Sequence, residues 1–141
     1  MSAICGIVRF DGKPVDSSEL ETMVVSSPYR GPDGVSYHLH ENAGFAHLAF
    51  HVTPESVHER QPLVSADGRY VLVADVRLDN RDELFGELGI RKDADRVVTD
   101  PELILAAWQK WGKACVEHFL GDFVFSIWDT RAKALFLARD P

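Results

Sequence analysis

The sequence has no long apolar run, no excess of basic residues and few cysteines. Its longest apolar stretches fall far short of the roughly 20 residues that a membrane-spanning helix needs, so no membrane association is expected. The formal net charge of -7 argues against nucleic-acid binding, which requires clustered Lys and Arg. Only Cys5 and Cys115 are present, and no secretory signal precedes them. A reduced, cytoplasmic setting is therefore expected.

Several cofactor motifs are also missing. The sequence contains neither a glycine-rich phosphate loop nor a Ser-Gly-Gly nucleotide motif, so the chain itself is not expected to bind ATP. His38 and His40 would share one face of a strand, but no cysteine or carboxylate stands at a matching spacing. No metal site and no cofactor are therefore predicted.

Short apolar runs bounded by turn residues predict β-strands. They fall in two groups, near the two ends of the chain, with helical patterns between them, which favours an α+β fold over alternating βαβ units. The expected strands cover residues 4–10, 35–40, 44–52, 61–66, 70–76, 123–128 and 134–138.

The helices are predicted from their start and stop residues. Ser18 and Glu21 have the spacing of a capping box, and Asp100 can cap a later helix that has Pro101 in its first turn. The expected helices begin near residues 18, 80, 101 and 114, and glycines 89, 112 and 121 end the last three.

The final expected strand, residues 134–138, is apolar at every position, and the chain stops soon after it. We expect a domain that is truncated at its C-terminus and leaves an open strand edge. A second copy of the chain, in a homodimer, or a separate partner subunit would cover that edge.

A series of short motifs resembles the N-terminal domain of asparagine synthetases, and the series covers essentially the whole chain. The motifs are Cys5-Gly6-Ile7, Arg30-Gly31-Pro32-Asp33-Gly34, Gln61-Pro62, Thr99-Asp100-Pro101-Glu102, Trp111-Gly112, Gly121-Asp122-Phe123, Trp128-Asp129 and the run from Leu135 to Asp140. The resemblance implies a class II glutamine amidotransferase domain over residues 1–141, with the four-layer αββα sandwich of two antiparallel sheets found in Ntn hydrolases. The C-terminal synthetase domain, which would bind ATP and magnesium, would be absent.

In that family an N-terminal cysteine attacks the glutamine amide, and its own α-amine serves as the base. The resemblance assigns the nucleophile position to Cys5, but Met1–Ile4 precede it, so its nitrogen lies in a peptide bond. A small buried residue on a strand is the alternative interpretation of Cys5. The other family positions for glutamine are Arg30, Asp33, Asp75, Val76 and Asp100.

Two of the family's glutamine contacts differ here. The triplet Asp75-Val76-Arg77 stands where active members carry Asn-Gly-Glu, and Ala49 stands where they carry the carboxylate-binding arginine. An ionised Asp75 would place negative charge beside the developing oxyanion. These departures resemble the branch with lasso-peptide cyclases and β-lactam synthetases, in which the domain is a scaffold for amide bond formation.

The first hypothesis is therefore a degenerate scaffold domain that packs against a synthetase domain or subunit. The second is an active glutaminase for asparagine biosynthesis, which would bind glutamine after removal of residues 1–4 exposes Cys5. A free-standing binding protein is a weaker third hypothesis.

Overall fold

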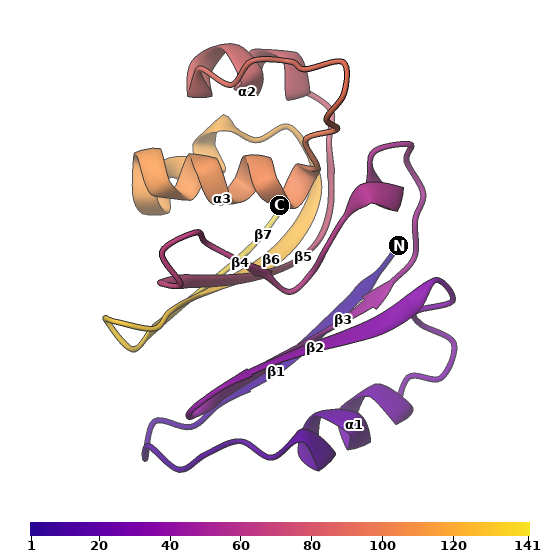
Figure 1. Ribbon diagram of the computed structural model, residues 1–141, viewed down its shortest axis with the longest axis vertical. Coiled ribbons are helices and arrows are strands. Elements are labelled where there is room, and N and C mark those ends of the chain that lie inside the picture. The colour runs from indigo at the N-terminus through magenta and orange to yellow at the C-terminus, as the bar shows by residue number, and fades with distance from the viewer.

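A computed structural model describes the whole chain, residues 1–141. Its strands form two separate antiparallel sheets, as the sequence predicts (Figure 1). The three-stranded sheet has the order β1-β3-β2 and consists of β1 (Ala3–Val8), β2 (Gly34–His40) and β3 (Ala43–Ala49). The four-stranded sheet has the order β4-β5-β6-β7 and consists of β4 (Leu63–Val64), β5 (Tyr70–Leu78), β6 (Gly121–Asp129) and β7 (Ala134–Arg139).

Helices cover the outer face of each sheet, which gives four layers (Figure 1). Helix α1 (Ser17–Val25) lies on the three-stranded sheet, and α2 (Arg81–Leu88) and α3 (Asp100–Trp111) lie over the four-stranded one. The 3-10 helices are η1 (Ser56–His58) and η2 (Gly112–His118). None of the helices has both the length and the apolar character that crossing a bilayer requires. The αββα sandwich predicted from the resemblance is confirmed.

Strand β5 shows why a nearly continuous apolar run forms one strand here. Alternate side chains of a strand point to opposite faces, and both faces of β5 are covered. Leu72 and Ala74 pack in the core beneath α2 and α3, whereas Val71 and Val73 pack between the sheets with Trp128. Because the sheets stack face to face, the residues between them form a second, smaller core.

Two helix starts differ from the prediction. The capping box of α1 is formed by Asp16 and Glu19, not by Ser18 and Glu21: the Ser18 N–H donates to Asp16 Oδ1 at 2.9 Å, and the Asp16 N–H donates to Glu19 Oε2 at 3.0 Å. Two overlapping boxes fit the sequence, and the carboxylate of Asp16 is an equally good cap. Helix α3 is capped by Thr99, so Asp100 is its first residue and its side chain is free for other bonds.

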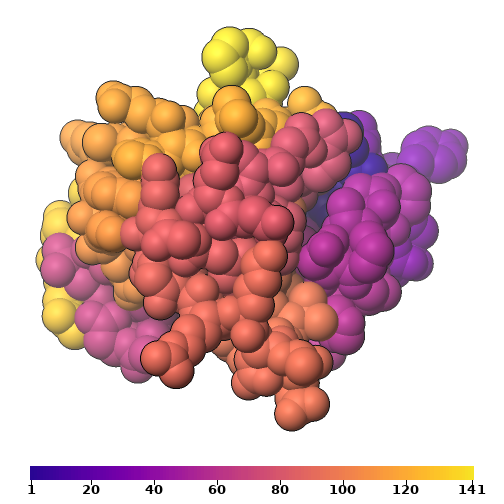
Figure 2. Space-filling view, turned by 90° about the horizontal axis from the view of Figure 1, so that it is seen from above, coloured from indigo at the N-terminus to yellow at the C-terminus, as the bar shows by residue number.

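Strand β7 lies at the edge of its sheet. It pairs only with β6, and Leu137 on it is 68% exposed. Seen from above, the last residues of the chain project from the body of the molecule (Figure 2). An apolar strand with an unpaired edge is a surface on which another strand can pair.

Candidate functional site

The N-terminus meets three other segments where β1 begins and β3 ends. The Ser2 N–H donates to Asp75 Oδ1 at 3.0 Å. The Phe50 N–H donates to Ser2 Oγ at 3.0 Å, and the Ser2 hydroxyl lies 3.4 Å from the Phe50 carbonyl oxygen. Arg30 Nη1 lies 3.4 Å from the carbonyl oxygen of Met1. Four segments far apart in the sequence therefore converge on one site, with the N-terminal residues beside the segment after β3 (Figure 2).

Asp75 reaches this site because of its place on β5. Val73 faces the three-stranded sheet, and Asp75, two residues further, points to the same side. Burial raises the pKa of the Asp75 carboxyl, and the Ser2 N–H, the Met1 amino group and Arg30 partly oppose this effect. Asp75 takes part in none of the ion pairs of the structure. It is a half-buried carboxylate that no cation contacts directly.

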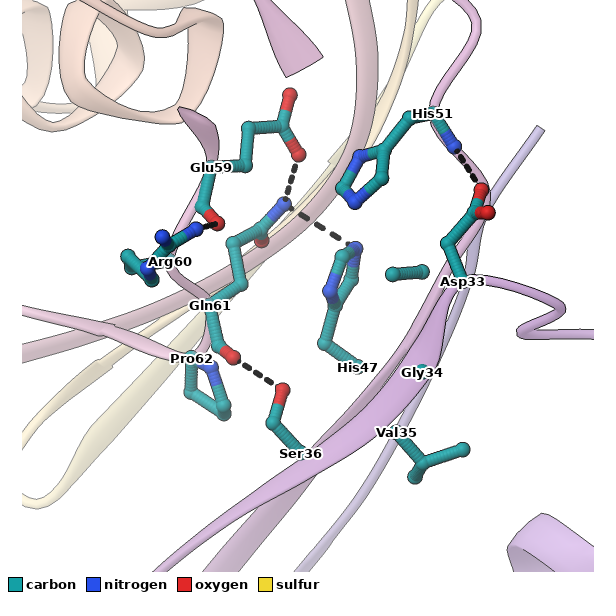
Figure 3. Close-up of a pocket in the computed structure, with 11 residues that line it drawn as sticks. Asp33, Gly34, Val35, Ser36, His47, His51, Glu59, Arg60, Gln61 and Pro62 are labelled. Atoms are coloured by element: carbon teal, nitrogen blue, oxygen red, sulfur yellow. Dashed lines mark hydrogen bonds between the residues drawn. The ribbon is translucent and has the colours of Figure 1, made fainter. Parts of the chain in front are cut away.

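A polar cavity of about 320 Å³ adjoins this site. Ala49 and His51 line it, and Phe50 between them contacts Ser2, so the cavity and the N-terminal contacts share one segment of chain. Figure 3 shows the side chains that turn toward it. The polar residues of its wall are Asp33, Ser36, His47, His51, Glu59, Arg60 and Gln61.

Gln61 joins the cavity wall to β5. The Ala74 N–H donates to Gln61 Oε1 at 2.7 Å, and Gln61 Nε2 donates to the Ala74 carbonyl oxygen at 2.9 Å. The same nitrogen lies 3.0 Å from Glu59 Oε2 and 3.2 Å from His47 Nε2 (Figure 3). Because Gln61 and His47 are both buried, this amide links the two sheets at the base of the cavity.

The cavity changes the protonation of two residues. Burial raises the pKa of Glu59 to about 7, and the charge of Asp75 adds to the rise. Burial lowers the pKa of His47 to about 4, with a contribution from His51. At neutral pH His47 is therefore neutral, and Glu59 exchanges its proton near physiological pH.

Arg30 and Asp33 lie on the loop before β2, which forms the rim of the site. Asp33 Oδ2 accepts a hydrogen bond from the His51 N–H at 2.7 Å. Gly31 has a φ of 77°, and a Cβ added there would lie 3.0 Å from the side chain of Leu48. The loop thus needs glycine both for its conformation and for its close approach to β3.

Cys5, Val76 and Asp100 do not join this group. Cys5, on β1, lies opposite Ala46 of β3. Its neighbour Ile4 packs between the sheets, so Cys5 points to the other face. Burial raises the pKa of its thiol. Val76 packs in the core beneath α2 and α3.

Asp100 lies on the helix side of β5. It is buried, accepts a hydrogen bond from the Leu78 N–H at 3.0 Å, and forms an ion pair with Arg81. Asp100 thus ties the end of β5 to α2, whereas Asp75, on the opposite face of the strand, points toward the N-terminus.

The site contains residues that the sequence did not single out, above all Ser2 and Glu59. For Ser2 the one signal is a small hydroxyl residue directly after Met1. Glu59 carries no signal, because its pKa depends on burial beneath segments distant in the sequence.

The whole chain, residues 1–141, matches the family model of the glutamine amidotransferase domain. The chain belongs to this family. It is 30% identical to asparagine synthetase [glutamine-hydrolyzing] 2 of Bacillus subtilis, over 86% of this chain and 16% of that protein. It is 29% identical to asparagine synthetase [glutamine-hydrolyzing] 3 of the same organism, over 99% of this chain and 23% of that protein.

A solved structure supports the fold of this amidotransferase domain. Glutamine phosphoribosylpyrophosphate amidotransferase from B. subtilis, in complex with ADP and GMP, matches 73% of this chain with a TM-score of 0.53 and 17% identity. The match covers 24% of that chain. The chain is thus a glutamine amidotransferase domain of the asparagine synthetase family, and it spans about a quarter or less of these relatives' length.

Proposed function

We propose that this amidotransferase domain does not hydrolyse glutamine and serves as a scaffold in an amide-forming enzyme of the asparagine synthetase family. The observation that carries the proposal is the carboxylate of Asp75 beside the N-terminal residues, 3.0 Å from the Ser2 nitrogen. In a glutaminase that position supplies a hydrogen-bond donor to the oxyanion. A carboxylate there repels the developing negative charge, and loss of one such donor alone costs about 3 kcal/mol.

The charges around the cavity also disfavour glutamine. Its α-carboxylate would need a guanidinium group, but Ala49 on the cavity wall offers only a methyl group. Asp33 and Glu59 add carboxyl groups to the same wall. Arg60 also lines the cavity, and its Nη1 donates a hydrogen bond to the neighbouring Glu59 carbonyl oxygen at 2.9 Å.

The alternative, an active glutaminase with Cys5 at its N-terminus, has less support. Removal of residues 1–4 would delete the pairs of Ala3 with Leu48 and of Ile4 with His47, and with them the first part of β1. It would also remove Ser2 from Asp75 and Ile4 from the core between the sheets. The thiol of Cys5, with its raised pKa and its orientation away from Asp75, is poorly placed for attack.

A scaffold of this kind needs a catalytic partner. The relatives extend far beyond the part that this chain matches, so we infer a synthetase domain or subunit of the same family as the partner. ATP and magnesium would be bound there.

An ammonia-release assay tests the proposal. We expect the purified chain to release no ammonia from glutamine above background and Cys5→Ala to change nothing, with an active asparagine synthetase as the positive control. A cooperative thermal transition would verify that each variant is folded. Ammonia release at ordinary amidotransferase rates that Cys5→Ala abolishes would instead establish the glutaminase hypothesis.

A further inference from the structure

The carboxylate of Asp75 has no cation in direct contact while Met1 is in place. It is half-buried, and its direct hydrogen-bond partner is the peptide N–H of Ser2 at 3.0 Å. Three charged groups face it from the surrounding segments: the Met1 amino group, Arg30 and Glu59. Glu59 opposes a second negative charge, and neither the Met1 amino group nor Arg30 comes within ion-pair distance of Asp75. A carboxylate in such a place is stabilised most by a close positive charge.

The geometry offers one such charge from the chain itself. Hydrolysis of the peptide bond between Met1 and Ser2 adds one water, releases free methionine and turns the Ser2 nitrogen into a primary amine. That nitrogen already lies 3.0 Å from Asp75 Oδ1. Met1 is 58% exposed, and a long contact from its carbonyl to Arg30 is its one tertiary hydrogen bond. A methionine aminopeptidase can reach such a residue, and these enzymes accept a small second residue such as serine.

We propose that, once Met1 is removed, the α-ammonium group of Ser2 forms an ion pair with Asp75. This inference rests on the proposed function and gives it a physical basis. The pair holds the amine protonated, so that it cannot accept a proton from a nucleophile. The serine hydroxyl stays hydrogen-bonded to the backbone of Phe50, so both polar groups of Ser2 anchor β1.

The first measurement is the N-terminus of the chain expressed from Met1. Mass spectrometry is expected to show loss of one methionine and a chain that starts at Ser2. A chain that keeps Met1 in full would overturn the proposal.

The second measurement is the pKa of the Ser2 amine, followed by NMR in a chain with isotope-labelled serine. An α-amine in a peptide has a pKa of about 7.7–8.0, and an opposite charge at this distance raises it by about 1 to 3. Asp75→Asn keeps the shape of the side chain and should return the pKa to its ordinary range. Asp122→Asn, which removes an exposed carboxylate paired with Arg77, should leave the pKa unchanged.

The third measurement compares the stability of two chains. One begins at Ser2 (the Ser2 chain), and the other is released from a cleavable fusion with Met1 still in place. Because folding raises the pKa of the amine, the added stability is present below about pH 8 and lost as the pH rises through the raised value. We expect a higher midpoint of urea unfolding for the Ser2 chain at pH 7, and no difference when both chains carry Asp75→Asn.

The outcomes separate this proposal from the scaffold function. An ordinary amine pKa in the Ser2 chain, or one that Asp75→Asn does not change, would overturn the ion pair whatever the ammonia assay shows. A raised pKa together with ammonia release from glutamine would support the ion pair and refute the scaffold function.

Discussion

Replacement of Arg81 tests whether Asp100 has a structural role in this chain. Arg81 forms an ion pair with Asp100, and its Nη2 donates to the Val98 carbonyl oxygen at 2.6 Å. The two side chains are only 19% and 5% exposed. Arg81→Met keeps the aliphatic volume over the ring of Phe85 but removes the charge. Asp100 is then left as a buried carboxylate whose partner is the Leu78 N–H.

The expected loss is large because an unpaired buried charge remains. Removing one partner of a buried pair costs about 3–5 kcal/mol. A domain of ordinary stability has about 5–15 kcal/mol in total, so this loss is a large share. At about 3 °C for each kcal/mol, the melting temperature should fall by about 10 °C or more. Urea unfolding and calorimetry would both measure the change.

Arg77→Met is the matched control. Arg77, near the end of β5, pairs with Asp79 and Asp122, but all three side chains are more than half exposed. Exposed ion pairs contribute about 0–1 kcal/mol, so this variant should unfold close to the unmodified chain. Equal losses in the two variants would refute the argument that burial makes the Arg81 contact important.

Three further predictions concern the cavity and the sheet edge. Gln61→Ala should destabilise the domain by about 2–3 kcal/mol in urea unfolding, because it leaves the buried N–H and carbonyl oxygen of Ala74 on β5 without these partners. Gln109→Ala, at an exposed glutamine, should change the stability by less than about 0.5 kcal/mol. Because the pKa of Glu59 is raised to about 7, the stability that its protonated form contributes is present below the ordinary pKa of 4.5 and is lost as the pH rises through about 7. Glu59→Gln should remove this dependence of the unfolding free energy on pH from a series of urea unfolding curves. An unchanged pH dependence would contradict the assignment to Glu59. The unmodified chain should self-associate at micromolar concentration through the edge of β7, and Leu137→Lys should abolish this self-association in sedimentation velocity. Leu120→Lys, at a leucine of similar exposure outside β7, should leave the self-association unchanged. A monomeric unmodified chain would contradict this prediction.

Local sequence patterns were enough to predict the strands, the α-helices and their order. The apolar run at residues 70–76 is the central part of β5, Gly89 ends α2 in a left-handed conformation, and Pro101 stands in the first turn of α3. These features act over a few residues, so periodicity and turn residues suffice to find them. The order of the motifs was also enough to identify the family, because order along the chain does not depend on contacts.

Which residues meet at the site depends on contacts between segments that are distant in the sequence. Ser2 and Asp75 are 73 positions apart, and Asp75 reaches the N-terminus because β5 points it toward the other sheet while Val76 points to the helices. The same alternation turns Cys5 away from the site. Which face a strand presents depends on its register and on the packing of the sheets, and both arise from contacts between distant segments. Cys5 and Asp75 could be named from the sequence, but only the folded sandwich shows that Ser2, rather than Cys5, lies beside Asp75.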